Sequence, residues 1–184
     1  WRGWRGGRRQ TGRVGTGGAQ LHNLRYFLRY FRLHKKEGAL LKSRTALRDY
    51  QVGEATALDA QKLLIEEGSP VYRLHRLRSI DGVAAMHERF TVVASKVPDF
   101  PGPDELPELL YRYLLEEYGL RVAAVREQLT AGLANEEDCR LLELTAPHAV
   151  MIIDAVSFDQ AATPVMMAHQ RVSTEHFMYV NEVR

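Results

Sequence analysis

The stretch Pro70–Val93, PVYRLHRLRSIDGVAAMHERFTVV, decides the fold of this chain. Its two halves are apolar runs that alternate with polar residues, and the turn SIDG lies between them. Asp81 and Gly82 in that turn suit a tight hairpin loop. Side chains along a strand point alternately to opposite faces. The stretch therefore predicts a β-hairpin whose two strands share one largely apolar face.

Three charged residues interrupt that apolar face. Arg76 and Arg78 continue it on the first strand, and Glu88 lies within it on the second. Burying such charges is costly unless they are paired or hold a ligand. Two interpretations stay open from the residues alone. One is a binding site for a small anionic molecule, because arginine offers bidentate donors; the other is a structural ion pair at the rim of the sheet.

The opposite face of the second hairpin strand carries His87 and Arg89, and His169 and Arg171 repeat this spacing near the C-terminus. These pairs predict either a polar surface, with a dimer contact as one use, or an ordinary solvated strand face. The histidines show no HxH or HxxxH spacing and no cysteine partner, so a metal site has little support.

Helix, strand, hairpin and strand occur twice along the chain. DAQKLL at 59–64 aligns with EDCRLL at 137–142, an offset of 78 residues. This pattern predicts an α+β domain built on an antiparallel sheet with flanking helices. The remaining predicted elements are a helix from about residue 55 to Gly68, helices at 108–119 and 135–144, and strands in 24–36, 121–129, 148–158 and 165–173.

Charge divides this 184-residue chain into two parts. Residues 1–36 hold ten Lys or Arg and no acid, whereas the other 148 residues hold 15 basic and all 23 acidic side chains. A basic, glycine-rich arm suits a phosphate-rich partner, although a merely solubilising tail or a wrongly placed gene start gives the same pattern. The composition, 45% hydrophobic and 26% charged, excludes a collagen, a fully disordered chain and a membrane bundle.

The sequence lacks the usual motifs of disulfide, nucleophilic and phosphate-binding sites. The single cysteine, Cys139, makes no internal disulfide and has acidic neighbours that disfavour a thiolate. There is no GxSxG elbow, and GRVGTGG lacks the ending of a phosphate loop. No apolar run suits a membrane span or a signal peptide. We expect a cytoplasmic protein without a cofactor or a metal, and the initial Trp1 suggests an incomplete start.

The sequence resembles the UTRA domain at three places. They are the run from Ala57 through Gly68 and Pro70 to Gly82, the helix LLYRYLLEEYG, and the second unit around Asp159 and Pro164. The UTRA domain is the effector-binding domain of the HutC branch of GntR-type bacterial transcription regulators. The resemblance covers residues 24–184 and implies a chorismate-lyase-like fold. It also implies a homodimer whose affinity for operator DNA changes when a small metabolite binds.

By the same resemblance, the ligand-contacting arginines of the family fall on Arg76 and Arg78, and its strand acid falls on Glu88. Met166 and His169 are further ligand-binding candidates. Leu109 and Met166 stand where members that bind phosphorylated amino sugars carry a serine and an acid, which favours a more apolar ligand with one anionic group.

Residues 1–23 resemble only the wing end of the winged helix-turn-helix that begins such regulators, so we expect that domain to be largely missing. Arg8, Arg9 and Arg13 are the candidate DNA contacts. Two alternatives remain: a lyase-like enzyme acting on a small carboxylate, and a basic-armed protein that binds nucleic acid without sequence preference.

Overall fold

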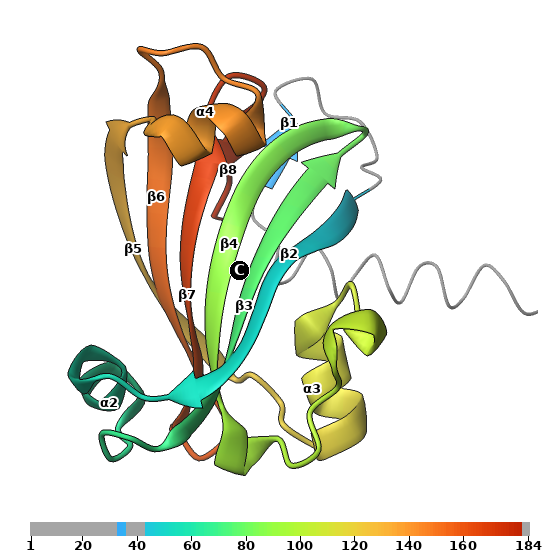
Figure 1. The fold of residues 1–184 in the computed structure, drawn as a ribbon, viewed down its shortest axis with the longest axis vertical. Helices are drawn as coiled ribbons and strands as arrows, with labels where there is room; N and C mark the ends of the chain where they lie inside the picture. Colours follow the sequence, from blue (N-terminus) through green and yellow to red (C-terminus); the bar gives the residue numbers. More distant parts are fainter. Residues whose placement is uncertain (1–32, 36–42, 182–184) are drawn as a thin grey trace, which may run out of the picture. The chain divides into compact units, whose positions relative to one another are not determined.

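The computed structural model describes residues 33–35 and 43–181 of the chain. A six-stranded antiparallel sheet in the order β2-β3-β4-β7-β6-β5 forms its centre, and β1 pairs with β8 in a separate two-stranded sheet (Figure 1). The strands are β1 (Leu33–Lys35), β2 (Ser43–Glu54), β3 (Pro70–Ile80), β4 (Val83–Val93), β5 (Ala124–Leu133), β6 (Ala149–Phe158), β7 (Pro164–Ser173) and β8 (Phe177–Tyr179).

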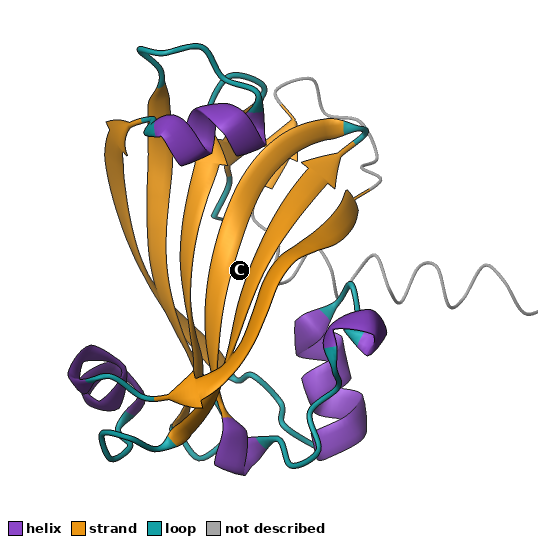
Figure 2. Ribbon diagram, viewed as in Figure 1, coloured by secondary structure: helices purple, strands orange, loops and turns teal. Residues whose placement is uncertain are grey.

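In the described residues, the α-helices α2 (Ala57–Leu63), α3 (Leu110–Tyr118) and α4 (Glu136–Leu142) accompany the sheet, and Figure 2 shows helices in purple. Short 3-10 helices cover Ala94–Lys96 and Pro103–Glu105. Helix α3 ends at Gly119, whose φ of 63° is the left-handed conformation that glycine adopts without strain. The antiparallel sheet with its helices confirms the predicted α+β fold class.

The chain repeats the order strand, helix, strand, strand: β2-α2-β3-β4 is followed by β5-α4-β6-β7, and β4 meets β7 at the centre of the sheet. Helices α2 and α4 begin with the same capping box, Thr56 with Asp59 and Asn135 with Asp138. The equivalent residues are therefore 79 apart, and the predicted offset of 78 is wrong by one. The sequence alignment matched the Leu-Leu pairs, whereas the caps fix the true register.

The two faces of the large sheet differ in what covers them. The face that carries Arg76, Glu88 and Ser157 receives α3, since Tyr111 of this helix bonds to Ser157; we call it the α3 face. The face that carries His87 receives α4, and α2 packs against β7; we call it the α2/α4 face. Buried apolar side chains line the α3 face on every central strand, among them Leu74, Phe90, Met166, Ala168 and Ile153.

The hairpin prediction is confirmed: β3 and β4 are joined by Asp81 and Gly82, both with positive φ. Strand β2 was missed, because charges fall on both of its faces and leave no period-two pattern. Strand β5 begins three residues later than predicted. Of the strand predicted in 24–36, only β1 lies within the described residues, and the basic arm 1–23 lies outside them.

We find no helix among residues 33–35 and 43–181 with the length and apolar character needed to cross a membrane.

Candidate functional site

A polar rung crosses the α3 face at the centre of the sheet. Arg76 of β3 lies opposite Glu88 of β4, which lies opposite Gln170 of β7. One carboxylate oxygen of Glu88, Oε1, is 3.1 Å from Arg78 Nη2 and 3.7 Å from Arg76 Nε. The other, Oε2, accepts a hydrogen bond of 3.3 Å from Gln170. The structure thus brings the three predicted charged residues together around one carboxylate.

Arg76 is 2% exposed and Glu88 1% exposed, so this rung lies in the interior and not at a wet rim. The shortest contact of the Arg76 guanidinium is a 2.7 Å hydrogen bond that it donates to the backbone carbonyl of Glu108. Burial lowers the pKa of Arg76, and the neighbouring Arg78 lowers it further, while Glu88 opposes the shift. The charge of Arg76 is therefore incompletely compensated by the groups around it.

Apolar side chains surround this rung. The guanidinium of Arg76 lies 5.9 Å from the centre of the Phe90 ring. On this face the small residues Ala168 of β7 and Ala155 of β6 lie opposite each other. Met166, two residues before Ala168 on β7, is fully buried. The arrangement offers a cation, a carboxylate and an amide within an apolar surface, which is the composition of many small-molecule sites.

One predicted ligand residue lies elsewhere. His169 is on the α2/α4 face, where it bonds Asp154 at 2.9 Å. Met166 and His169 are three positions apart on one strand, so their side chains lie on opposite faces, and the ligand-binding role of His169 stays a prediction. The residue that joins the rung from this strand is Gln170, which has the correct parity and could have been found by counting from Met166.

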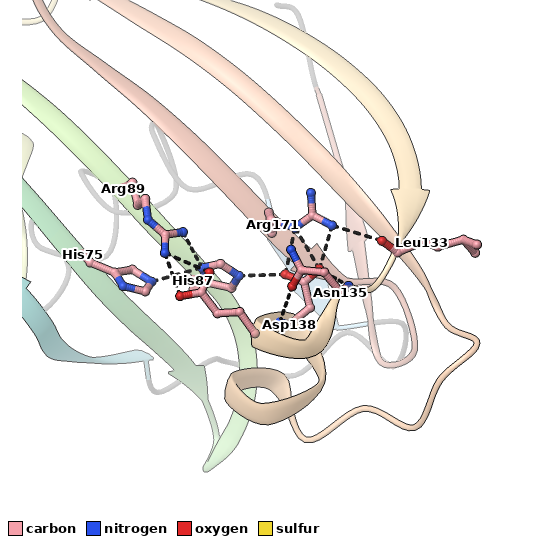
Figure 3. A network of polar contacts seen from close by, with 8 residues as sticks. His75, His87, Arg89, Leu133, Asn135, Asp138 and Arg171 are labelled. Carbon is pink, nitrogen blue, oxygen red and sulfur yellow. Dashed lines mark hydrogen bonds and ion pairs between the residues drawn. The ribbon is translucent and has the colours of Figure 1, made fainter. Parts of the chain in front are cut away.

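A second polar network, drawn in Figure 3, occupies the α2/α4 face. It lies on the other side of the sheet from the rung, because His87 and Glu88 are neighbours on one strand. His87 is the buried centre of this network: its Nε2 is 2.8 Å from Asp138 Oδ1, and its Nδ1 is 3.1 Å from His75 Nε2. Arg171 donates to both oxygens of Asp138 through Nε, at 2.8 Å and 2.9 Å. The prediction of a solvated strand face is wrong for His87, because the N-terminus of α4 covers it.

Asp138 is the acceptor at the centre of these bonds. Although its burial alone would raise the pKa, hydrogen bonds from Arg171, His87 and the backbone of Asn135 lower it to about 2. The carboxylate is therefore ionised at neutral pH, and His87 must donate through Nε2. Beside it, Arg89 holds Glu137 at 2.7 Å, and this bond lowers the pKa of Glu137. The network ties β4 and β7 to α4.

Within residues 33–35 and 43–181, no three His, Cys, Asp or Glu side chains lie close enough together to hold a metal ion. Cys139 is half-buried on α4. Arg8, Arg9 and Arg13, the predicted DNA contacts, lie outside this described part.

Comparison with known proteins gives a consistent family. The pattern of the UTRA domain matches residues 39–178. Among curated proteins, the HTH-type transcriptional regulator GgaR of Escherichia coli (strain K12) is 26% identical over 123 residues, which cover 67% of this chain and 48% of that protein. The chain thus spans about half the length of the curated relatives it matches.

Two solved structures share the fold at low sequence identity. A GntR-family transcriptional regulator from Enterococcus faecalis V583 aligns over 76% of this chain and 100% of its own, with a TM-score of 0.70 and 19% identity. The effector domain of PhnF from Mycobacterium smegmatis aligns over 78% of this chain and 88% of its own, also with a TM-score of 0.70 and 19% identity.

Proposed function

Because the chain belongs to the UTRA domain family, we propose that it is the ligand-sensing domain of a GntR-type transcription regulator, of the HutC branch. The relatives named as transcriptional regulators support this role. The alignment with the curated regulator covers 48% of the length of that protein.

The ligand is a small molecule with one anionic group, which binds at Arg76, Arg78 and Glu88. The observation that carries this proposal is the buried Arg76, whose carboxylate neighbour is 3.7 Å away and whose closest acceptor is the uncharged carbonyl of Glu108. An anion at the position of that carbonyl would compensate the guanidinium far better. Binding would then displace the segment that leads into α3.

The body of the ligand lies on the apolar part of the same face. Met166, Ala168 and Phe90 are buried there and offer no hydrogen-bonding side chain to sugar hydroxyls. We therefore favour a carboxylate with an apolar body over a sugar phosphate. Glu88 and Gln170 accept and donate hydrogen bonds at one end of this surface and orient the ligand.

We assign the DNA contacts of this chain to its basic N-terminal arm. In residues 1–23, Arg8, Arg9 and Arg13 contact phosphates or the minor groove and add affinity with little sequence discrimination. Residues 24–184 form the sensing domain. The regulator acts in the cytoplasm as a homodimer, and ligand binding shifts it between arrangements of different operator affinity.

A lyase-like enzyme is the second candidate, since a shared fold does not fix a function. The names of the relatives favour the sensor. A sensor releases its bound acid chemically unchanged, whereas an enzyme consumes it, so mass spectrometry of the ligand after long incubation separates the two.

Arg76→Gln tests the assigned site. In a thermal-shift screen of small carboxylic acids and phosphate monoesters, we expect at least one carboxylic acid to raise the melting temperature of the wild-type chain. The shift should disappear in Arg76→Gln, because the glutamine amide carries no charge. Arg73→Gln is the matched control, since Arg73 lies on the α2/α4 face and bonds Asp59. An undiminished shift in Arg76→Gln contradicts the site.

A further inference from the structure

Two hydroxyl side chains of strand β2 lie beside Arg78. Ser43 and Thr45 are two positions apart, before the irregularity in the register of this strand, so their side chains share a face. Thr45 lies directly opposite Arg78 in the pairing of β2 with β3, which places both hydroxyls on the α3 face. The surroundings of the rung therefore include two hydrogen-bonding groups besides its charged residues and Gln170.

The two hydroxyls differ in what they contact. Ser43 Oγ accepts a hydrogen bond of 3.0 Å from Arg78 Nη1, while Arg78 Nη2 reaches Glu88 at 3.1 Å. Thr45 Oγ1 is buried, and within residues 33–35 and 43–181 it has no hydrogen-bond partner. Burying a hydroxyl without a partner is unfavourable, because the group loses its bonds to water. In native proteins, such a group commonly bonds to something other than the chain itself.

The charges near Thr45 indicate what kind of partner fits there. Arg76, Arg78 and Glu88 are all buried. Two guanidinium groups face one carboxylate in this cluster, so a single negative charge on the ligand balances it. The proposed anionic group at Arg76 already supplies that charge. The group that meets Thr45 is therefore an uncharged donor or acceptor.

The register also fixes how far this group lies from the anion. Thr45 is opposite Arg78, and Arg76 is two residues from Arg78 on the same strand, so Thr45 and Arg76 are diagonal neighbours. Diagonal neighbours on adjacent strands are about 7–8 Å apart. One small molecule can reach both side chains only if its uncharged polar group is close to its anionic group.

We infer that Thr45 is a ligand-binding residue and that the ligand is a carboxylic acid with a hydroxyl group close to its carboxylate. This inference rests on the anion site of the proposed function and adds a second point of recognition to it. The carboxylate binds Arg76, and the hydroxyl exchanges a hydrogen bond with Thr45 Oγ1. Two hydroxyl groups suit each other, because each can donate or accept.

This contact makes the ligand hydroxyl a determinant of specificity. A buried site that bonds a hydroxyl discriminates against the analogue without it, because the polar group of the site is then left unpaired. We therefore expect a hydroxy acid to bind about tenfold more tightly than the same acid without the hydroxyl.

Thr45→Val tests the inference with three matched acids. Phenyllactate and β-hydroxy-β-phenylpropionate each carry one hydroxyl near the carboxylate, and phenylpropionate carries none. By isothermal titration calorimetry, we expect the full wild-type chain to bind at least one hydroxylated acid about tenfold more tightly than phenylpropionate. In Thr45→Val this preference should disappear while the affinity for phenylpropionate stays the same. Thr45→Ser keeps the hydroxyl and should keep the preference.

The melting temperature without ligand separates binding from a structural role. Thr45→Val should be at least as stable as the wild type, because its hydroxyl bonds nothing in the described part of the chain. Thr91→Val is the matched control, since the buried Thr91 accepts a hydrogen bond of 3.2 Å from Arg73 on the α2/α4 face. It should melt at a lower temperature and keep the preference for the hydroxy acid.

Equal affinities of the wild type for the hydroxylated acids and phenylpropionate, or an unchanged preference in Thr45→Val, would overturn the role of Thr45. A melting temperature lowered as much as in Thr91→Val would do the same. If phenylpropionate binds in these cases and Arg76→Gln abolishes its binding, the anion site stands. If none of the three acids binds the wild type, or Arg76→Gln binds them equally well, the anion site is wrong together with this inference.

Discussion

Asp138→Ala is expected to lower the free energy of unfolding by about 4 kcal/mol, measured by denaturant unfolding at pH 7. The substitution leaves the buried His87 and the guanidinium of Arg171 without their carboxylate. It also removes the half of the α4 capping box in which Asp138 accepts a hydrogen bond from the backbone N–H of Asn135. Breaking a buried ion pair on one side costs more than the pair itself contributes, because the remaining charge stays buried.

The equivalent residue of the first repeat provides the matched control. Asp59 caps α2 in the same way, but its ion-pair partner Arg73 is about one-third exposed. We expect Asp59→Ala to cost about 2 kcal/mol, of which the cap contributes about half. Equal losses in the two variants would contradict a special role for the network around His87.

The free energy of unfolding measured as a function of pH in acid gives a second test of the role of Asp138. Its pKa falls from 3.8 to about 2 on folding, so the unfolded chain binds this proton more tightly. The stabilisation from this carboxylate is therefore complete above pH 3.8 and is lost as the pH falls toward 2. Asp138→Ala should show a shallower loss of stability across that window than the wild type.

Glu88→Gln is expected to lower stability by about 3 kcal/mol and to make the protein responsive to simple anions. The amide keeps the shape of the side chain but removes the charge that contacts both Arg76 and Arg78. Added acetate, at constant ionic strength, should then stabilise the variant, by about 1.4 kcal/mol at ten times its dissociation constant. The measurement is the melting temperature against acetate concentration.

Asp154→Asn is the control for this experiment, because Asp154 pairs with the half-exposed His169 on the α2/α4 face. Neither its stability nor its response to acetate should change by more than a few tenths of a kcal/mol. An acetate response that is the same in the wild type, Glu88→Gln and Asp154→Asn would mean that the anion does not act at the Arg76 rung.

The sequence allowed the hairpin and its charged rung to be predicted, because both depend on local signals. Asp81-Gly82 specifies the two-residue loop, and strand alternation then places Arg76 and Glu88 on one face. The contact between Arg76 and Glu108 depends on how the segment before α3 crosses the sheet. No local pattern encodes that crossing, so the degree of burial was not predicted.

The network behind the rung was missed for a similar reason. His87 and Asp138 are 51 residues apart, and the helix that joins them is only seven residues long. The capping-box pattern of Asn135 and Asp138 was available in the sequence and would have corrected the repeat offset. Aligning the leucines instead shifted the second repeat by one residue, and the equivalence of Asp59 and Asp138 was lost.

The central claim is that an anionic ligand binds to Arg76 on the α3 face. The most direct test is NMR of the arginine Nε–H groups in the full chain, titrated with the carboxylic acid that gives the largest thermal shift. We predict that the Arg76 signal moves with a saturable curve, while the signal of Arg171, behind the sheet, stays in place. Movement of Arg171 with an unchanged Arg76 would contradict the account.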